Sequence, residues 1–362
     1  MADHAGSAPL AAARHAHVLA ALERDGSVRI SALTEELGIT PVTLRRDLVQ
    51  MERDGLLRRV HGGAVRAIAH EDRDELARTR PSGSIAVLVP SLNYYWPGVL
   101  RGIESAAREL GFRIVLRGAS YELQDERPVL ERLLQDPQIK GLLVAPNIDS
   151  EHAQDVVQWL AGARVPSVLI ERDAITLPSH GVVESVTTAH DHGARLAAWH
   201  LDALGHRHVG LVLSRNSPTS RKIRSGWADA WQQMGVSNPF EVLLPERSGS
   251  DFAPAVHAAL DAAEREGVTA LLVHSDPEAM AIVDLAMARG VRVPGDLSIV
   301  AYDDEVAQLF SPALTAIAPP RFSVGEHALR LLVDRIHDPD GPARRTVLAP
   351  ALVQRESTGP VR

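Results

Sequence analysis

The chain has 362 residues, which is enough for two or three domains with a substantial core. It contains no cysteine, so disulfide scaffolds, thiol catalysis and cysteine-based zinc sites are excluded. The formal charge of −8 excludes a chain that is basic throughout, so contact with nucleic acid would have to come from a local patch. No apolar stretch is long enough to span a bilayer and no signal-type run is visible, so we expect a cytoplasmic protein without a membrane partner.

The first part of the chain predicts two short helices in succession. Val18 and Leu22 are spaced for one buried helical face, and Gly26 ends that helix. After a short extended segment, Ser31 is placed to cap a second helix that ends at Gly38.

The stretch from Thr40 to Gly55 predicts a third helix, which follows the second after a very short turn. Leu44, Leu48 and Met51 recur at helical spacing and define its buried face. Two helices joined in this way form a helix-turn-helix, whose second helix lies in the major groove of DNA. The polar residues that we place at the start of this helix or opposite its buried face are Thr40, Thr43, Arg46 and Gln50.

A β-hairpin is predicted directly after the third helix. Leu57 and Val60 are apolar, and Gly62 with Gly63 permits a tight turn. As a wing, this hairpin would carry Arg58, Arg59 and His61 towards the sugar-phosphate backbone. Six arginines and three acidic residues lie between positions 45 and 66, so the local basic patch that the composition requires is present.

The motifs TLRRDL and DGLLRRVHGGA resemble those of DeoR-type winged helix-turn-helix regulators. The resemblance covers residues 14–65 and implies that Thr43, Arg45 and Arg46 contact DNA, with Arg59 and His61 in the wing. Arg45 lies at the flank of the helical wheel, where it would reach a phosphate or pair near Asp47. We therefore expect a DNA-binding domain over residues 1–65 and a charged linker over residues 66–83.

The rest of the chain, residues 84–362, alternates short apolar runs with amphipathic helical stretches. Runs such as SIAVLV, GLLVAP and ALLVHSD predict strands buried on both faces, which is typical of parallel sheets covered by helices. There are more such runs than one compact sheet needs, so we expect an α/β domain of two Rossmann-like subdomains.

Ligands of open α/β sheets bind beyond the carboxyl ends of the strands, so the residues just after each run are candidates. An aromatic group follows the first run, and carboxylates, arginines and amides follow others, which suits a polyhydroxylated ligand. The candidate ligand-binding residues are Asn93, Tyr94, Trp96, Asn147, Glu171, Arg172, Arg221, Arg224, Ser275, Asp276 and Asp303.

This second region resembles the effector-binding domain of LacI/GalR regulators, a periplasmic-binding-protein-like type I fold. The block VRVPGDLSIVAYDDEVAQLFSPALTAI is the most specific part of the resemblance. It implies subdomains of about 84–188 with 318–344 and about 189–317 with 345–360, so the chain would cross between them near Thr188, Ala318 and Arg344. A ligand-clamping arginine is usual where Ile223 stands, so either Arg221 or Arg224 is expected to replace it.

Two resemblances in one chain imply a hybrid, with a DeoR-type reader before a LacI-type sensor. The expected function is a dimeric, ligand-responsive repressor of carbohydrate-utilisation genes that binds double-stranded operator DNA. A sugar is the expected effector, and a nucleobase or nucleoside stays open because aromatic rings stack on either. A transport receptor and a sugar-processing enzyme are the rival classes, but neither a signal peptide nor a catalytic set is visible.

Three His-x-His pairs have the spacing of metal ligands but lack a third ligand at fixed spacing. They are His15/His17, His190/His192 and His206/His208. We therefore expect no metal, no cofactor and no enzymatic activity.

Overall fold

The computed structural model describes residues 11–25, 27–53, 57–60, 63–66, 83–119, 125–236 and 240–361. Most of the expected linker and the candidate His61 lie outside these ranges. The chain divides into two compact units, Met1–Arg80 and Pro81–Arg362. No helix in the described ranges is long and apolar enough to cross a membrane.

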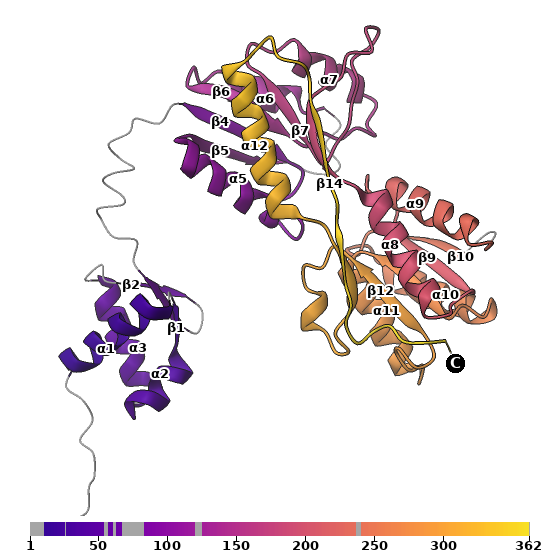
Figure 1. Ribbon diagram of the computed structural model, residues 1–362, viewed down its shortest axis with the longest axis horizontal. Helices are drawn as coiled ribbons and strands as arrows, with labels where there is room; N and C mark the ends of the chain where they lie inside the picture. Colours follow the sequence, from indigo (N-terminus) through magenta and orange to yellow (C-terminus); the bar gives the residue numbers. More distant parts are fainter. Residues whose placement is uncertain are drawn as a thin grey trace, which may run out of the picture. The chain divides into compact units, whose positions relative to one another are not determined.

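The first unit contains helices and a small antiparallel sheet of order β1-β3-β2. Its described elements are α1 (Ala11–Asp25), β1 (Ser27–Arg29), α2 (Ile30–Leu37), α3 (Pro41–Arg53), β2 (Leu57–Val60) and β3 (Gly63–Arg66). The antiparallel β2 and β3 are the predicted wing, and β1 adds a third strand to it. Figure 1 shows these elements as one compact group.

The predicted buried face of α3 is confirmed, because Leu44, Leu48 and Met51 are fully buried in the core of this unit. Thr40 caps the start of this helix, because the Thr43 amide donates to the Thr40 hydroxyl at 3.3 Å. The prediction that Ser31 caps the second helix is wrong, because α2 already begins at Ile30. The chain passes from β1 into α2 without an intervening cap residue.

The second unit has two lobes, each built on a six-stranded sheet. The sheet of the first lobe has the order β14-β8-β7-β6-β4-β5 and is parallel throughout. The elements of this lobe are β4 (Ser84–Val89), α5 (Trp96–Leu110), β5 (Arg113–Gly118), α6 (Arg127–Leu134), β6 (Ile139–Val144), α7 (Ala153–Ala161), β7 (Ser167–Ile170), β8 (Ser185–Thr188), α12 (Arg321–His337) and β14 (Arg345–Leu348).

The sheet of the second lobe has the order β10-β9-β11-β12-β13-β15 and is parallel except for the antiparallel β13–β15 pair. Its elements are α8 (His190–Ala203), β9 (Val209–Ser214), α9 (Ser220–Gln233), β10 (Phe240–Leu244), α10 (Phe252–Arg265), β11 (Ala270–His274), α11 (Asp276–Ala288), β12 (Ser298–Tyr302), η1 (Ala307–Leu309), β13 (Thr315–Ala318) and β15 (Ala351–Val353).

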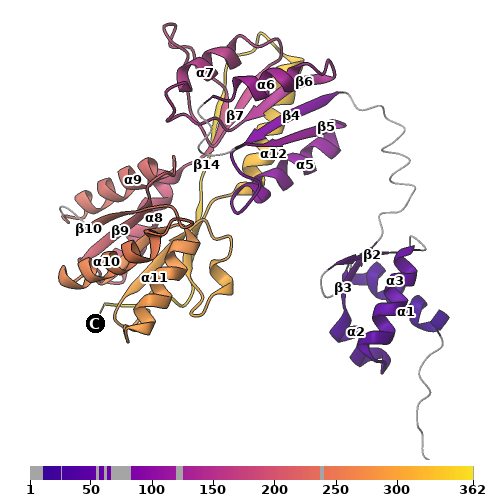
Figure 2. The ribbon, with the colours of Figure 1, turned by 180° about the vertical axis from the view of Figure 1, so that it is seen from behind.

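Helices cover both faces of each sheet, as the continuous apolar strands predict. In the first lobe α5 and α12 pack on one face (Figure 1), and α6 and α7 pack on the other (Figure 2). In the second lobe α8 and α9 cover one face, and α10 and α11 cover the other. The α/β fold with two parallel-dominated sheets is therefore the one predicted.

The chain passes between the lobes three times. It crosses at Ala189, at Pro319–Pro320 and at Ala349–Pro350, where one sheet ends and an element of the other lobe follows. The expected third crossing near Arg344 is wrong, because β14 continues the first lobe's sheet beside β8. The Arg344 amide donates to Glu184 of that lobe at 3.1 Å, which keeps the chain there.

Candidate functional site

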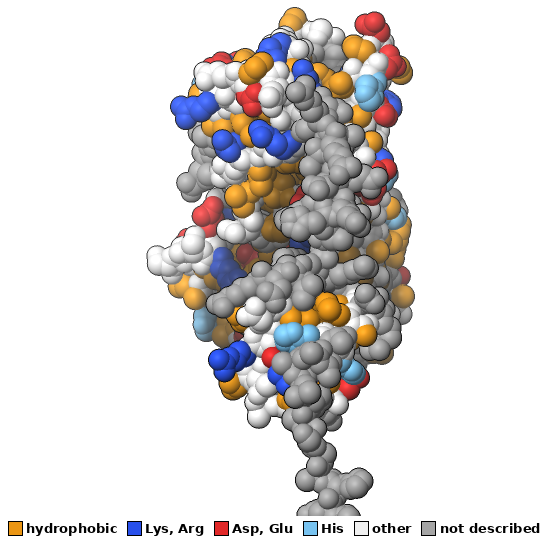
Figure 3. Space-filling model, turned by 90° about the vertical axis from the view of Figure 1, so that its left-hand side faces the viewer, with side chains coloured by type: hydrophobic (Ala, Val, Ile, Leu, Met, Phe, Trp, Pro, Cys, Tyr) orange, Lys and Arg blue, Asp and Glu red, His pale blue; other side chains and the backbone are white. Residues whose placement is uncertain are grey.

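The outer face of α3 is the candidate nucleic-acid interface. Thr40, Arg46 and Gln50 are exposed and Thr43 is half-buried, all away from the core face of the helix. Arg45 also lies on α3, and Arg58 and Arg59 lie on β2. Among the described residues on the face drawn in Figure 3, basic and acidic side chains are interspersed. Contact with DNA would therefore come from a small local group of cations.

Asp47 of α3 forms an ion pair with α1, which packs behind this interface. Both oxygens of its carboxylate accept hydrogen bonds from the Arg14 guanidinium of α1, at 2.7 and 3.0 Å. Partial burial alone would raise the pKa of Asp47, but the Arg14 hydrogen bonds hold that pKa below its ordinary value. The partner that the structure describes for Asp47 thus comes from α1, and the side chain of Arg45 lies outside the described part of the chain. The Arg14–Asp47 pair fixes the angle at which α3 is presented.

In the second unit, two neighbouring cavities lie in the cleft between the lobes. The inner cavity has a volume of about 200 Å³ and the outer one a volume of about 490 Å³. Five residues line both of them, namely Arg172, Asn216, Ser217, Pro218 and Glu246. The predicted ligand-binding residues that line the inner cavity are Tyr94, Trp96, Glu171, Arg172, Ser275 and Asp303. Those that line the outer cavity are Asn147, Arg172, Arg221 and Arg224.

Asp303 is the predicted residue that is best placed to bind a ligand, since it lines the inner cavity although it is almost completely buried from solvent. It follows β12 with a φ of 102°, a conformation that is strained for a residue with a side chain. Burial raises the pKa of its carboxyl to about 6, against the opposing charges of His190 and Arg321. Tyr94 from the other lobe also opposes this rise in the pKa. Two acceptor oxygens at the cavity floor suit a ligand with adjacent donors.

Glu171 lines the inner cavity, but its carboxylate is already occupied by the protein. It accepts from the Tyr95 hydroxyl at 2.6 Å, from the Thr188 hydroxyl at 2.7 Å and from the Thr188 amide at 2.9 Å. His190 Nε2 lies 3.3 Å from the same group. Burial alone would raise the pKa of Glu171, but these partners outweigh it and lower the pKa to about 2.

Glu171 lines the cavity as predicted, and its role as a direct ligand contact stays a prediction. With four partners, its carboxylate has little acceptor capacity left for a ligand. Its partners are Tyr95 and Thr188 of the first lobe, the latter at the end of β8 just before the first crossing, and His190 at the start of α8 in the second lobe. Glu171 ties the hinge together and positions the cavity wall.

Asp276 is a correction to the predictions. Its carboxylate is fully buried and accepts from the backbone amides that follow β12, those of Asp304, Glu305, Val306 and Ala307, at 2.7–3.2 Å. It lines neither cavity and instead shapes the loop that carries Asp303. Burial raises the pKa of Asp276 to about 6 despite these hydrogen bonds.

The aromatic side chains that follow β4 point in different directions. Trp96 is 1% exposed and packs edge-on against Tyr95, so it contributes only an edge to the cavity wall. The Tyr94 hydroxyl accepts from the Asp276 amide of the other lobe at 3.2 Å.

Asn93 is exposed and lines neither cavity, so its prediction as a ligand contact is not supported. Ser275 lines the inner cavity while its hydroxyl donates to Glu278 at 2.6 Å in a capping box.

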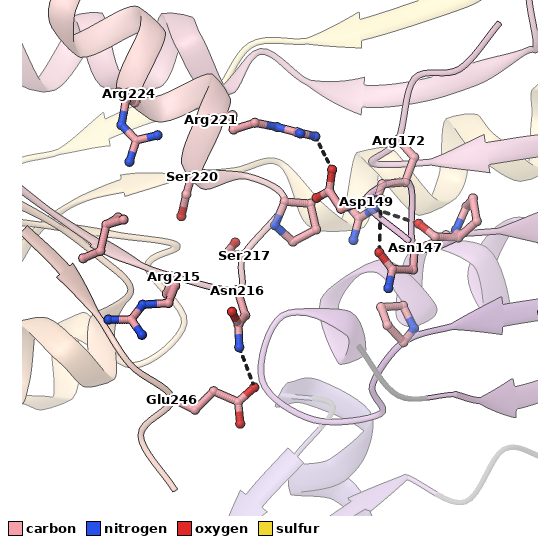
Figure 4. A pocket seen from close by; sticks show the side chains of 15 residues that line it. Asn147, Asp149, Arg172, Arg215, Asn216, Ser217, Ser220, Arg221, Arg224 and Glu246 are labelled. Carbon is pink, nitrogen blue, oxygen red and sulfur yellow. Dashed lines mark hydrogen bonds and ion pairs between the residues drawn. The ribbon is translucent and has the colours of Figure 1, made fainter. Parts of the chain in front are cut away.

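Figure 4 shows the outer cavity, where arginines converge from α9 and from the end of β9. Arg221 reaches across the cleft to Asp149 of the first lobe at 2.5 Å. Arg224 instead binds Glu241 of its own lobe at 2.7 Å. Arg221 therefore spans the lobes and Arg224 does not, while both line the outer cavity and the choice between them as the ligand-clamping arginine stays open. Neighbouring Lys222 makes a second bridge, to Asp173 of the first lobe at 2.7 Å.

Two buried histidines of the inner cavity are absent from the predictions. His190 Nδ1 lies 3.1 Å from the Tyr302 hydroxyl, and the His274 ring packs edge-on against the Tyr302 ring. His274 is the last residue of β11, so the strand-end rule selects the residue after it and misses His274 itself. In the sequence, His190 stands out only as half of a His-x-His pair. The described residues contain no group of three or more His, Asp or Glu side chains arranged for a metal ion.

Two family models match the chain. The model of the DeoR-like helix-turn-helix domain matches residues 14–68, and that of the periplasmic binding protein-like domain matches residues 198–358. These matches indicate both kinds of domain in one chain. The second match begins within α8 of the second lobe.

Curated relatives are transcriptional regulators. The chain is 28% identical over 280 residues to the HTH-type transcriptional regulator DegA of Bacillus subtilis, covering 76% of this chain and 81% of that protein. It is 24% identical over 323 residues to the arabinose metabolism transcriptional repressor of Geobacillus stearothermophilus, covering 87% of this chain and 86% of that protein.

Solved structures show the same architecture. A LacI family transcriptional regulator from Enterococcus faecium, with bound ribose, superposes with a TM-score of 0.64 at 25% sequence identity. The match covers 77% of this chain and 100% of that chain. The homologues found are regulators of transcription, and the LacI-family likeness covers the two-lobed unit.

Proposed function

We propose that this chain is a DNA-binding transcriptional repressor whose operator affinity is controlled by a small molecule bound between the two lobes. The observation that carries the proposal is the presence, in one chain, of an exposed helix-turn-helix face and, between two lobes, a cavity whose lining includes carboxylate, hydroxyl and imidazole side chains. The named regulators among its relatives support the same function.

The reader is proposed to be a DeoR-type winged helix-turn-helix within residues 1–65, joined to a LacI-type sensor over residues 84–362. Thr43 and Arg46 of α3 would contact base edges, while Thr40, Arg45, Gln50, Arg58, Arg59 and His61 would contact the sugar-phosphate backbone or its surroundings. The family models support the two domain types, and the exposed face of α3 supports the assignment of roles.

The effector is proposed to be a sugar that regulates carbohydrate-utilisation genes. Asp303 supplies acceptors and Tyr94 a hydroxyl at the cavity floor, a combination that pairs with neighbouring hydroxyl groups. A similar solved structure holds ribose, and a curated relative represses arabinose metabolism. The inner cavity of about 200 Å³ is of the size of a monosaccharide.

The switch is proposed to be closure of the lobes around the effector. A ligand shifts such an equilibrium only by its differential affinity for the open and closed states. A C2 homodimer in the cytoplasm, without enzymatic activity, completes the proposal, because a two-fold operator matches a two-fold protein.

A thermal-shift screen against sugars and nucleobases tests this function. An effector that binds only the folded state raises the melting temperature, and one that binds between the lobes should also change operator affinity. A ligand that raises the melting temperature but leaves operator affinity unchanged would contradict the proposed control.

A further inference from the structure

The outer cavity is basic although the chain as a whole is acidic. Over the whole sequence, 46 aspartates and glutamates outnumber 38 lysines and arginines. Among the described residues that line the outer cavity, four arginines meet two carboxylates, those of Asp149 and Glu246. The arginines are Arg172, Arg215, Arg221 and Arg224. The composition of the chain does not account for this local excess of positive charge, which favours an anion in the cavity.

These arginines reach the cavity from three places in the fold. Arg172 follows β7 of the first lobe by two residues, is 4% exposed and lines both cavities. Arg215 directly follows β9 of the second lobe, and Arg221 and Arg224 lie in the first turns of α9. Figure 4 shows the side chains of Arg215 and Arg224 on the second-lobe side of the cavity. An anion bound there would meet guanidinium groups from several directions.

Arg215 differs from the arginines of α9 in its ion pairing. Arg221 binds Asp149 at 2.5 Å. Arg224 binds Glu241 at 2.7 Å. Within the described ranges, no ion pair joins the exposed side chain of Arg215 to a carboxylate, and no interaction line reaches it in Figure 4. The guanidinium of Arg215 is therefore available to a ligand in this cavity.

The inner cavity has the opposite charge. Its described lining includes the carboxylates of Glu171, Glu246 and Asp303, with Arg172 at the boundary that it shares with the outer cavity. An anion in the inner cavity would be repelled by these carboxylates, whereas a hydroxyl group could donate to Asp303. Since the two cavities share lining residues, one ligand can extend from the inner into the outer cavity. Such a ligand carries hydroxyl groups at its inner end and negative charge at its outer end.

We propose that the outer cavity is the subsite for a phosphate group, so that the effector is a phosphorylated sugar and Arg215 is the main contact of its phosphate. This inference rests on the proposed function and names the class of its effector. A phosphate monoester carries a charge of about −1.5 to −2 at pH 7 and has three strong acceptor oxygens. That charge matches the two positive charges by which the arginines of the lining exceed its carboxylates. A carboxylate group supplies less charge and fewer oxygens.

The first test uses inorganic phosphate as the probe and the melting temperature of the full chain as the readout. Sodium phosphate at about 20 mM is compared with sodium chloride of equal ionic strength and pH, and a Kd of about 2 mM should raise the melting temperature by about 2–5 °C. Arg215→Gln should remove most of this rise. Arg132→Gln is the matched control, because Arg132 is an exposed arginine of α6 that lines neither cavity, and this variant should keep the rise.

The comparison between the two variants isolates the subsite. General stabilisation by phosphate, and any phosphate bound by the first unit, are common to both variants and cancel. An equal rise in Arg215→Gln and Arg132→Gln overturns the proposal. Sodium acetate should raise both variants equally, and a difference as large as that with phosphate would make this a carboxylate subsite and overturn the assignment to phosphate.

The second test compares sugars with their phosphate esters by calorimetric titration of the full chain, beginning with D-ribose and D-ribose 5-phosphate. For a sugar that binds, the ester should bind about 10–100-fold more tightly, and Arg215→Gln should remove most of this preference. An ester that binds no more tightly than its parent sugar overturns the proposal. The test with inorganic phosphate does not depend on the identity of the sugar, so it decides the proposal even if none of these sugars binds.

Operator binding is measured separately, so that the two failures can be told apart. If phosphate binds at Arg215 and the chain ignores operator DNA, the proposed function fails and the phosphate subsite stands. If an uncharged ligand changes operator affinity while the two variants respond equally to phosphate, the proposed function stands and the phosphate subsite fails.

Discussion

Asp303 combines the features that a ligand-sensing residue requires in this cleft. Its backbone is strained, its carboxylate is buried, and it lines the same cavity as Tyr94 of the opposite lobe. A buried carboxylate with few internal donors costs stability in the empty protein, and a ligand with donors recovers that cost. Function and stability should therefore oppose each other at this residue.

Asp303→Asn tests this opposition. Because the folded pKa of about 6 lies above the ordinary value of 3.8, Asp303 contributes stability below pH 3.8 and loses that contribution as the pH rises through 6. At pH 7.5 the variant should therefore be more stable without effector, by at most about 3 kcal/mol, and at pH 5 the gain should shrink. Thermal unfolding at both pH values measures it, and an equal effect at both would contradict the assignment.

Glu171 shows the reverse behaviour. Its pKa is lowered to about 2, so its stabilising contribution is present above pH 4.5 and is lost as the pH falls through 2. Glu171→Gln places an amide donor where hydroxyl, amide and imidazole groups now point at oxygens, so unfolding by urea should become easier by about 2–4 kcal/mol.

Glu109→Gln is the matched control for Glu171→Gln. Glu109 binds Arg330 of α12 in the same lobe, but it is well exposed, so its loss should cost less than about 1 kcal/mol. Similar losses for the two variants would show that Glu171 does not brace the hinge.

At the scale of elements, α3 is where the pattern of the sequence and the structure agree most closely. Leu44, Leu48 and Met51 are spaced for one face, and that face is the buried one, so the opposite face is left for DNA. Local spacing is enough here because a short amphipathic helix has only one way to bury its apolar stripe. The cap at Thr40 is equally local.

Arg46→Ala tests the reading face of α3. If Arg46 contacts a base, operator affinity should fall by about 1–3 kcal/mol, and the loss should be largest on the operator sequence itself. Arg108→Ala, an exposed arginine of α5 paired only with Glu104 in the described structure, serves as the control. Anisotropy titrations in which both variants bind like the unaltered protein would remove Arg46 from the interface.

Other features of the structure cannot be predicted from the spacing of residues in the sequence. The strand-end rule located the cleft, but it could not tell that the Asp276 carboxylate is consumed by backbone amides or that Glu171 is surrounded by partners. Both depend on residues far away in the chain. The third crossing was misplaced for the same reason, since β14 is recognisable only by its pairing with β8.

The first turn of α9 joins the two lobes by ion pairs. Arg221 binds Asp149 and Lys222 binds Asp173, and all four side chains are at least one-third exposed. Such pairs contribute about 0.2–1 kcal/mol each and weaken with salt. The double change Arg221→Gln and Lys222→Gln should therefore lower effector affinity about 2–20-fold at low salt.

Salt provides the check on this pair of bridges. Between about 50 and 300 mM NaCl, effector affinity measured by calorimetry should fall in the unaltered protein and change less in the double variant, because the Debye length shortens over that range. Equal salt dependence in both proteins would show that the bridges do not favour closure.

At the scale of the whole molecule, the proposed DNA binding and the proposed effector binding belong to different folded units. The overall charge of −8 would keep the protein from DNA, and the arginines between positions 45 and 66 oppose it locally. Control therefore requires coupling between two folded units, and such coupling is usually worth about 1–3 kcal/mol. Its size is set by how differently the effector binds the open and closed lobes.

The most direct measurement is the affinity of the full chain for labelled duplex DNA from its own chromosomal neighbourhood, with and without a ligand that raises its melting temperature. We expect binding that weakens steeply with salt and a change of about 5–150-fold when the ligand is added. No binding at low ionic strength, or the same affinity at saturating ligand, would contradict the account of a DNA reader governed by the cleft.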